Sequence, residues 1–205
     1  TRPLLVGMYG RHSTISLRSR AYNRNMNITK YMHACLVIEK GEQRVIVDPG
    51  VWTEDFVVPE NVVAIVVTHE HPDHFDPDKL AAIYDKNPES VLFAHQSIVD
   101  KMPDHKSQAV SAGETIPAGK FFLRFTGGEH AVIHPSYPRV ANLGVIIEDA
   151  LYYPGDSFTP PNAAVHTLAL PASAPWMKIS ETMDFLTSVK PMRVFPTHDA
   201  ILSET

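Results

Sequence analysis

The chain has 205 residues, of which 44% are hydrophobic and 20% charged, a composition typical of a soluble globular domain. Its formal net charge of -5 argues against a generally nucleic-acid-binding surface. No apolar run approaches the ~20 residues that span a bilayer, and the single cysteine, Cys35, excludes an internal disulfide. We therefore expect a cytoplasmic protein for which neither a membrane nor nucleic acid is a partner.

Residues 1–25 differ in composition from the rest of the chain. They contain five arginines and several serines, and the first acidic residue of the chain is Glu39. Such a segment is either an organelle leader or an artefact, namely a cloning remnant or a mis-set start site with Met26 as the true initiator. We expect residues 26–205 to form one domain.

The first half of this domain reads as strands with one helix. Val62–Val67 is a continuous apolar run of the kind found in buried strands, and Asp76, Pro77 and Asp78 are typical of the start of a helix, which we expect to end near Lys86. Further strands are expected at 28–32, 34–39, 44–48 and 90–94, with His33 and Cys35 alternating along one strand.

The second half continues the mixed pattern. A helix is expected at Ile179–Val189, where apolar residues recur at helical spacing, and a short one near Ile98–Lys101. Strands are expected at 120–125, 143–148, 151–153, 165–170 and 192–195. Strands and helices that are mixed in this way predict an α/β (α+β) fold of two sheets with helices packed outside them.

The loop after Val62–Val67 reads HEHPDH and carries three imidazoles and two carboxylates. A loop anchored by a strand end can direct His69, His71, Asp73 and His74 toward one point, as a divalent metal requires. These four residues could serve two metals about 3.5–4 Å apart, but two metals need more ligands. Three candidates follow at later strand ends: His130, Asp156 and His198.

These motifs resemble the metallo-β-lactamase superfamily over nearly all of the chain from Met26 onward. Within it, the segments MHACLVIE, IVDPG, GGEHAVIHP, YYPGDS and PTHDA look like short bacterial metal-dependent hydrolases of the ascorbate-6-phosphate lactonase-like branch. The resemblance implies an αββα sandwich, and a further C-terminal helix beyond this sequence. Aspartate at position 156, where many true β-lactamases carry cysteine, argues against a β-lactam specialist.

The resemblance also implies a ligand set and a chemistry. His69, His71 and His130 would hold one metal, Asp73, His74 and His198 the other, and Asp156 would bridge them. The metals would be two divalent ions, zinc by preference, with manganese or iron as alternatives. A metal-bound hydroxide, oriented by Asp73 as the catalytic residue, would then hydrolyse an ester, lactone, thioester or phosphodiester. The alternatives are a non-catalytic metal-binding module and a redox di-iron protein.

Several residues have two readings. His134 competes with His130 as a ligand and is otherwise a candidate for contacting substrate or supporting a ligand. Asp48 either caps a turn or orients a ligand histidine, and His33 either faces the site or is a core histidine. Trp176 and Lys178 either hold an anionic substrate at the rim or pack and solvate a proline-rich loop. Specificity is expected in the loops 49–60, 131–142 and 157–178.

Overall fold

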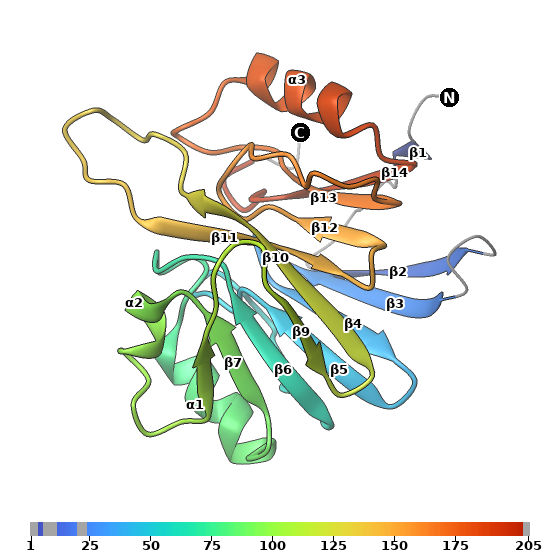
Figure 1. Cartoon of the computed structure of the whole chain (residues 1–205), viewed down its shortest axis with the longest axis vertical. Helices are drawn as coiled ribbons and strands as arrows, with labels where there is room; N and C mark the ends of the chain where they lie inside the picture. Colours follow the sequence, from blue (N-terminus) through green and yellow to red (C-terminus); the bar gives the residue numbers. More distant parts are fainter. Residues whose placement is uncertain (1–3, 6–11, 20–23, 203–205) are drawn as a thin grey trace.

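Two seven-stranded sheets lie face to face with helices on their outer surfaces in the computed structural model (Figure 1). The structure describes residues 4–5, 12–19 and 24–202. A large apolar cluster that includes Leu36, Phe121, Phe125, Tyr153 and Phe195 fills the space between the sheets. This arrangement confirms the αββα sandwich predicted from the sequence.

The first sheet contains the strand that leads into the histidine-rich loop. Its order is β2-β3-β4-β5-β6-β7-β8, with antiparallel pairing from β2 to β5 and parallel pairing from β5 to β8. All residues of β6 except Val63 are buried, because the strand is covered on both faces. The strands are His12–Ser19 (β2), Arg24–Tyr31 (β3), Leu36–Lys40 (β4), Gln43–Val47 (β5), Val62–Val67 (β6), Val91–Ala94 (β7) and Ser107–Ala109 (β8).

The second sheet has the order β1-β14-β13-β12-β11-β10-β9. It is antiparallel from β9 to β12 and parallel from β12 through β14 to β1. Its strands are Leu4–Leu5 (β1), Thr115–Ala118 (β9), Phe121–Glu129 (β10), Ala141–Ile147 (β11), Leu151–Tyr153 (β12), Thr167–Pro171 (β13) and Arg193–Thr197 (β14).

The helices cover the outer faces of the two sheets. Helix α1 (Pro77–Lys86) begins at Asp76, whose side chain accepts hydrogen bonds from the next turn, and it buries Leu80 and Ile83 against the first sheet. Helix α2 (Gln96–Val99) is a single turn that follows β7. Helix α3 (Ile179–Val189) packs Phe185 on the second sheet. None of the described helices is long and apolar enough to cross a membrane.

Within the predicted domain, and apart from shifts at strand ends, the structure differs from the predicted elements in three places. Strands β8 and β9 carry no sequence signal, because both are short and mostly solvated. Helix α2 begins two residues earlier than expected. His33 does not lie on a strand: it occupies the turn between β3 and β4 with a φ of 67°, and the Tyr31 amide closes that turn by donating to the carbonyl of Cys35 at 2.9 Å.

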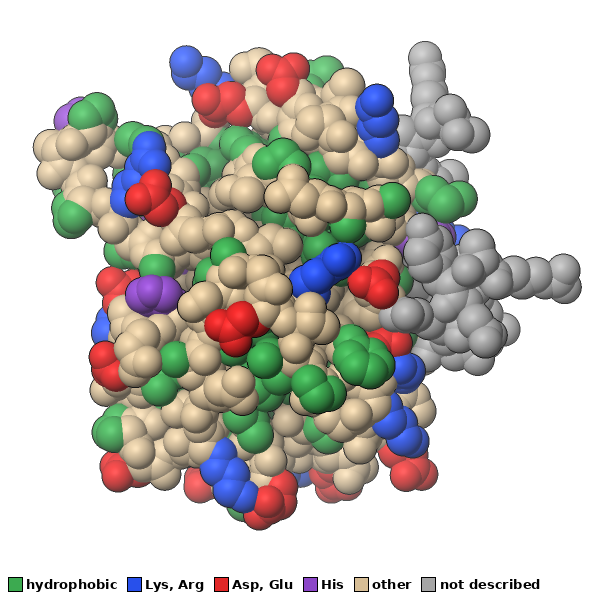
Figure 2. Space-filling model, in the orientation of Figure 1, with side chains coloured by type: hydrophobic (Ala, Val, Ile, Leu, Met, Phe, Trp, Pro, Cys, Tyr) green, Lys and Arg blue, Asp and Glu red, His purple; other side chains and the backbone are tan. Residues whose placement is uncertain are grey.

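The boundary proposed at residue 26 stays a prediction. Residues 1–3, 6–11 and 20–23 of the expected leader lie outside the described part of the chain. The remaining segments include β1, which pairs with β14, and β2, which pairs with β3. On the face seen in Figure 2, acidic and basic side chains are interspersed over the described surface, and neither sign forms a patch of its own.

Candidate metal centre

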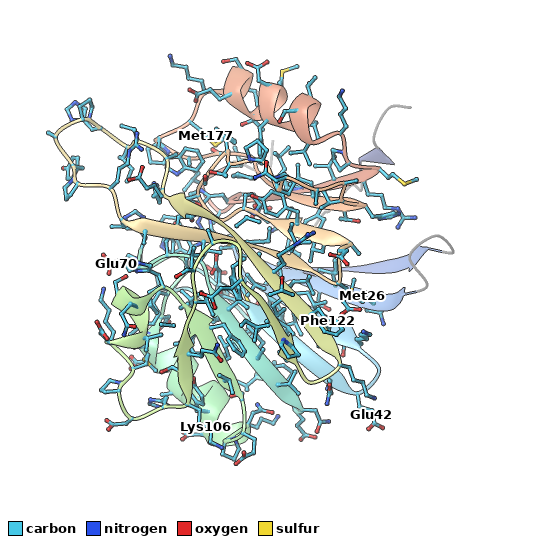
Figure 3. All side chains as sticks on the ribbon, in the orientation of Figure 1. Met26, Glu42, Glu70, Lys106, Phe122 and Met177 are labelled. Carbon is cyan, nitrogen blue, oxygen red and sulfur yellow. The ribbon has the colours of Figure 1, made fainter. Side chains whose placement is uncertain are left out.

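The predicted ligands converge at one end of the sandwich, where β6, β10, β12 and β14 terminate. In Figure 3 this end lies between the labelled Glu70 and Met177, and Glu42 marks the opposite end of the sheets. His69 to His74 follow β6 of the first sheet. His130, Asp156 and His198 follow strands of the second sheet. The candidate site therefore draws on both sheets.

The predicted ligand atoms form two adjacent groups, with Asp156 between them. One nitrogen each from His69, His71 and His130 lie within 4.8 Å of one another, and the same holds for atoms of a second group, His33, Asp73, His74 and His198. Asp156 lies between the two groups. Its Oδ2 is 3.3 Å from His130 Nε2 and 3.1 Å from His198 Nε2, and its Oδ1 is 3.2 Å from His74 Nε2.

Hydrogen bonds at Nδ1 fix the orientation of the imidazoles. His130 Nδ1 lies 2.6 Å from the carbonyl of Ala131, and His198 Nδ1 lies 2.6 Å from the carbonyl of Ser173. A carbonyl can only accept, so each Nδ1 carries a proton, and in the neutral imidazole each Nε2 is the nitrogen whose lone pair would face a metal. His74 Nδ1 is held in the same way by Asp48, at 2.6 Å.

The atoms that face the centre of the cluster form no hydrogen bond: the contacts of 3.1–3.3 Å between imidazole nitrogens and Asp156 lack hydrogen-bond geometry. They are buried, although burying an unpartnered polar atom costs about 1–3 kcal/mol. A divalent cation would satisfy all of them at once, and neutral imidazole and carboxylate are suitable ligands for zinc. The residues present therefore fit a metal site. The atoms are Nε2 of His69, His74, His130 and His198, and Oδ1 of Asp156.

Two glycines allow the backbone to pack closely around this loop. A Cβ on Gly50 would lie 1.9 Å from the carbonyl oxygen of Asp73, so only glycine lets the chain pass behind the ligand loop. Gly155 has a φ of +65°, and a Cβ there would lie 2.4 Å from Asn142 Oδ1. That Asn142 oxygen accepts the Asp156 amide at 3.0 Å, which positions the aspartate.

Charge in the cluster is balanced between carboxylates and imidazoles. Burial raises the pKa of the Asp156 carboxyl, but the adjacent His74, His130 and His198 outweigh burial and hold this pKa well below its ordinary value. Burial lowers the pKa of His198, yet Asp156 and Asp73 raise it to about 9. For His69, burial and the neighbouring His74 outweigh the effect of Asp156 and lower its pKa well below the ordinary value. Burial lowers the pKa of His74 too, but Asp156 and Asp48 outweigh burial and raise it well above its ordinary value, so a metal would bind by displacing protons from His198 and His74.

The residues with two readings are now placed. Asp48 accepts the Thr68 amide at 2.8 Å and holds His74, so it serves both the turn and a predicted ligand. His33 Nε2 lies 2.9 Å from Asp73 Oδ2. His134 is exposed outside the cluster and contacts Ser136.

The two candidate substrate-binding residues of the proline-rich loop, Trp176 and Lys178, lie in different environments. Trp176 Nε1 donates to Asp156 Oδ2 at 2.9 Å, so its indole touches the cluster directly. Lys178 is exposed at the start of α3, where its amide donates to Glu181.

A cavity of about 510 Å³ opens directly over the cluster, a volume that suits a small-molecule substrate. Its walls include Trp52, Ile133 and Trp176, one from each of the three loops expected to carry specificity, together with Ile201. Trp52, Ile133 and Ile201 were not among the residues predicted individually. Their apolar character was the only sign in the sequence that they could line a cavity, because the sequence does not show which loop residues meet in space.

The model of the Beta-lactamase superfamily domain matches residues 27–198, which include every predicted ligand. The chain belongs to this superfamily. Its relatives include Protein Rv0786c of Mycobacterium tuberculosis, which is 38% identical over 183 residues, 87% of this chain and 86% of that protein.

Solved structures extend the superfamily comparison to the fold. A protein of Parabacteroides distasonis assigned as a metal-dependent hydrolase superposes with a TM-score of 0.78 at 20% identity, over 94% of this chain and 90% of that one. CmlA, a diiron β-hydroxylase from Streptomyces venezuelae, superposes with a TM-score of 0.63 at 15% identity, over 85% of this chain and 44% of CmlA. These likenesses show a fold that is shared by metal-dependent proteins.

Proposed function

We propose that the protein is a dinuclear metal-dependent hydrolase, with zinc as the preferred metal. The observation that carries this proposal is a cluster of buried nitrogen and oxygen atoms without hydrogen-bond partners, directly below an open cavity that is lined by several residues of the cluster. Buried polar atoms with a purely structural role are normally hydrogen-bonded, and these atoms are not. Three of their residues, His130, Asp156 and His198, line a cavity, which points to a site that also admits substrate.

The two groups of ligand atoms suggest one metal each. Asp156 is the candidate bridge, since its two oxygens face both groups. Trp176 donates to Oδ2 of this bridge and would keep the carboxylate in one orientation. His33 does the same for Asp73. The first metal would be held by His69, His71 and His130, and the second by Asp73, His74 and His198.

Bound metals would polarise the substrate oxygen and lower the pKa of water from 15.7 to about 7, which supplies a nucleophile at neutral pH. The protein's own groups then orient the reactants. Asp73 lines the cavity and can accept a hydrogen bond from the attacking water. Asp73 Oδ2 is already engaged by His33, so the carboxylate is fixed before substrate arrives.

Two other functions predict different results. A non-catalytic metal-binding module would need no cavity above the metals, and the cavity over this cluster favours the enzyme. A redox di-iron protein would use the same fold, as the likeness to CmlA indicates. Metal identity therefore belongs in the first experiment.

The experiment combines metal analysis with an activity screen. Protein loaded separately with zinc, manganese or iron is assayed on esters, lactones, thioesters, phosphodiesters and β-lactams, and metal content is measured by elemental analysis. We expect two ions per chain and hydrolysis with zinc. Asp156→Ala should lose metal and activity together, whereas Asp184→Ala, an exposed aspartate on α3, should change neither.

Saturation at one ion per chain would contradict the dinuclear arrangement. Activity only with iron, and only in the presence of an oxidant, would instead support the redox protein. Two bound zinc ions without turnover of any substrate would favour the non-catalytic module.

A further inference from the structure

The cavity above the cluster has a polar floor and apolar walls. The floor consists of the predicted ligands His71, Asp73, His130, Asp156 and His198. The remaining lining is apolar, and among the described lining residues there is no lysine or arginine. These wall residues are Trp52, Pro72, Ile133, Ala174, Pro175, Trp176 and Ile201.

Three basic side chains near this end of the sandwich are paired with acidic partners, and Lys178 is exposed and does not line the cavity. Lys30 pairs with Asp199 at 2.8 Å, and Arg139 pairs with Glu129 at 2.6 Å. Lys101 pairs with Glu70 in the ligand loop. A phosphate or carboxylate group is normally bound by unengaged cations, because burying an unpaired charge is costly. The described walls therefore offer an anionic substrate nothing beyond the metals themselves.

The wall side chains expose apolar surface that a substrate could cover. Trp52 and Ile133 are each 43% exposed and Ile201 is 51% exposed, although all three line one cavity. The only polar atom of the Trp176 side chain is already engaged, since its N–H donates to Asp156. A wall of this kind favours apolar groups by removing their surface from water.

We infer that the substrate is an uncharged ester, thioester or lactone with an apolar acyl group, and not a phosphate ester. This inference rests on the proposed hydrolase function. In the reaction, the oxygen of water bonds to the carbonyl carbon and the bond to the leaving oxygen or sulfur breaks. One proton of water goes to the leaving group and the other is released from the acid formed, so no oxidant or reductant is needed. Lys178, on the exposed side of the loop, takes no part in binding.

The first test is a chain-length series on zinc-loaded protein. The probes are p-nitrophenyl acetate, butyrate, hexanoate and octanoate, with bis-p-nitrophenyl phosphate as the anionic comparison. Each added methylene should raise kcat/KM about fourfold until the cavity is filled. The phosphodiester should be the poorest substrate. A flat series, or preference for the phosphodiester, would overturn the inference while leaving the hydrolase proposal intact.

Two neighbouring residues supply a matched pair of variants. Ile133 lines the cavity and Val132 does not, yet they are 43% and 42% exposed. Ile133→Ser should lower kcat/KM for the octanoate ester several-fold more than for the acetate ester. Val132→Ser should leave the ratio of the two unchanged. If both variants changed the octanoate-to-acetate ratio of kcat/KM equally, the cavity wall would not be what binds the acyl chain.

A binding measurement separates this inference from the proposed function. Alkan-2-ones from four to ten carbons are uncharged and cannot be hydrolysed, and their binding can be followed by calorimetry, with inorganic phosphate as the anionic probe. Affinity should rise with chain length even if no ester is turned over. In that case hydrolysis fails and the apolar specificity stands. Affinity that does not change with chain length, or phosphate that binds more tightly, would refute the apolar specificity.

Discussion

Replacing Asp48 with asparagine tests whether the protein fixes the proton of His74. Asp48 is fully buried and accepts three hydrogen bonds, from the Thr68 amide at 2.8 Å, the Thr68 hydroxyl at 2.6 Å and His74 Nδ1 at 2.6 Å. Asparagine keeps the size of the side chain but has only one oxygen. If that oxygen faces the Thr68 amide, the NH2 group faces His74 Nδ1.

Nδ1 must then accept, and the proton of a neutral His74 moves to Nε2, the atom aimed at the predicted metal. Losing such a partner typically costs 10- to 100-fold in metal affinity, or about 1.4–2.7 kcal/mol. The opposite orientation of the amide sets two donors against each other at Thr68, which costs about 1–3 kcal/mol of stability. Asp48→Asn therefore loses affinity or stability in either orientation.

The assay is competition for zinc between the protein and a chromophoric chelator, with melting temperatures measured with and without EDTA. Asp76→Asn is the matched control, because asparagine also caps helices and Asp76 lies outside the cluster. The control should bind zinc with wild-type affinity. A folded Asp48→Asn protein with wild-type affinity and melting temperature would refute the role assigned to Asp48.

Three further predictions use the same cluster. His130→Ala should weaken zinc binding far more than His134→Ala in chelator competition, since only His130 faces the cluster; similar losses would contradict the assignment. Gly155→Ala should lower the melting temperature and zinc content, because its Cβ would lie 2.4 Å from Asn142 Oδ1; an unchanged protein would show that the backbone there is free to move. The third concerns pH. The pKa of His198 is raised to about 9 in the folded metal-free protein, against about 6.5 in the unfolded chain. Protonation of His198 therefore stabilises the fold by an amount on the order of 3 kcal/mol, which is fully present below pH 6.5 and is lost as the pH rises through 9. The melting temperature of EDTA-treated protein should fall over this range while zinc affinity rises, and His198→Gln should lessen both trends.

Local patterns predicted the elements that carry the ligands. The apolar run Val62–Val67 and the Asp76 to Pro77 helix start appear in the structure where the sequence placed them, because burial on both faces and helix capping leave strong local signatures. Strand β9 has no comparable signature. It is a short edge strand whose side chains are mostly solvated, so its sequence need not alternate.

For the site, the sequence indicated which side chains follow strand ends but not how they are oriented. The turn at His33 depends on a left-handed backbone conformation that is uncommon for residues other than glycine, and the extended strand expected there was wrong for this reason. The contact of Trp176 with Asp156 joins two loops separated by β13. Such contacts arise from the packing of distant segments and have no local pattern.

The supply of candidate ligands from both sheets gives the cluster a mechanical role. Besides the packing between the sheets, polar contacts join the two layers, among them Tyr153 to the carbonyl of Ala34 at 3.0 Å, Lys30 to Asp199 at 2.8 Å near the cluster, and Lys40 to Glu148 at 2.6 Å at the far end. Metals bound at the cluster would be held by ligands from both sheets, so the sheets could separate only after the metals are released. Amide exchange in β6 and β11, which lie in opposite layers, would then slow together as the metals bind.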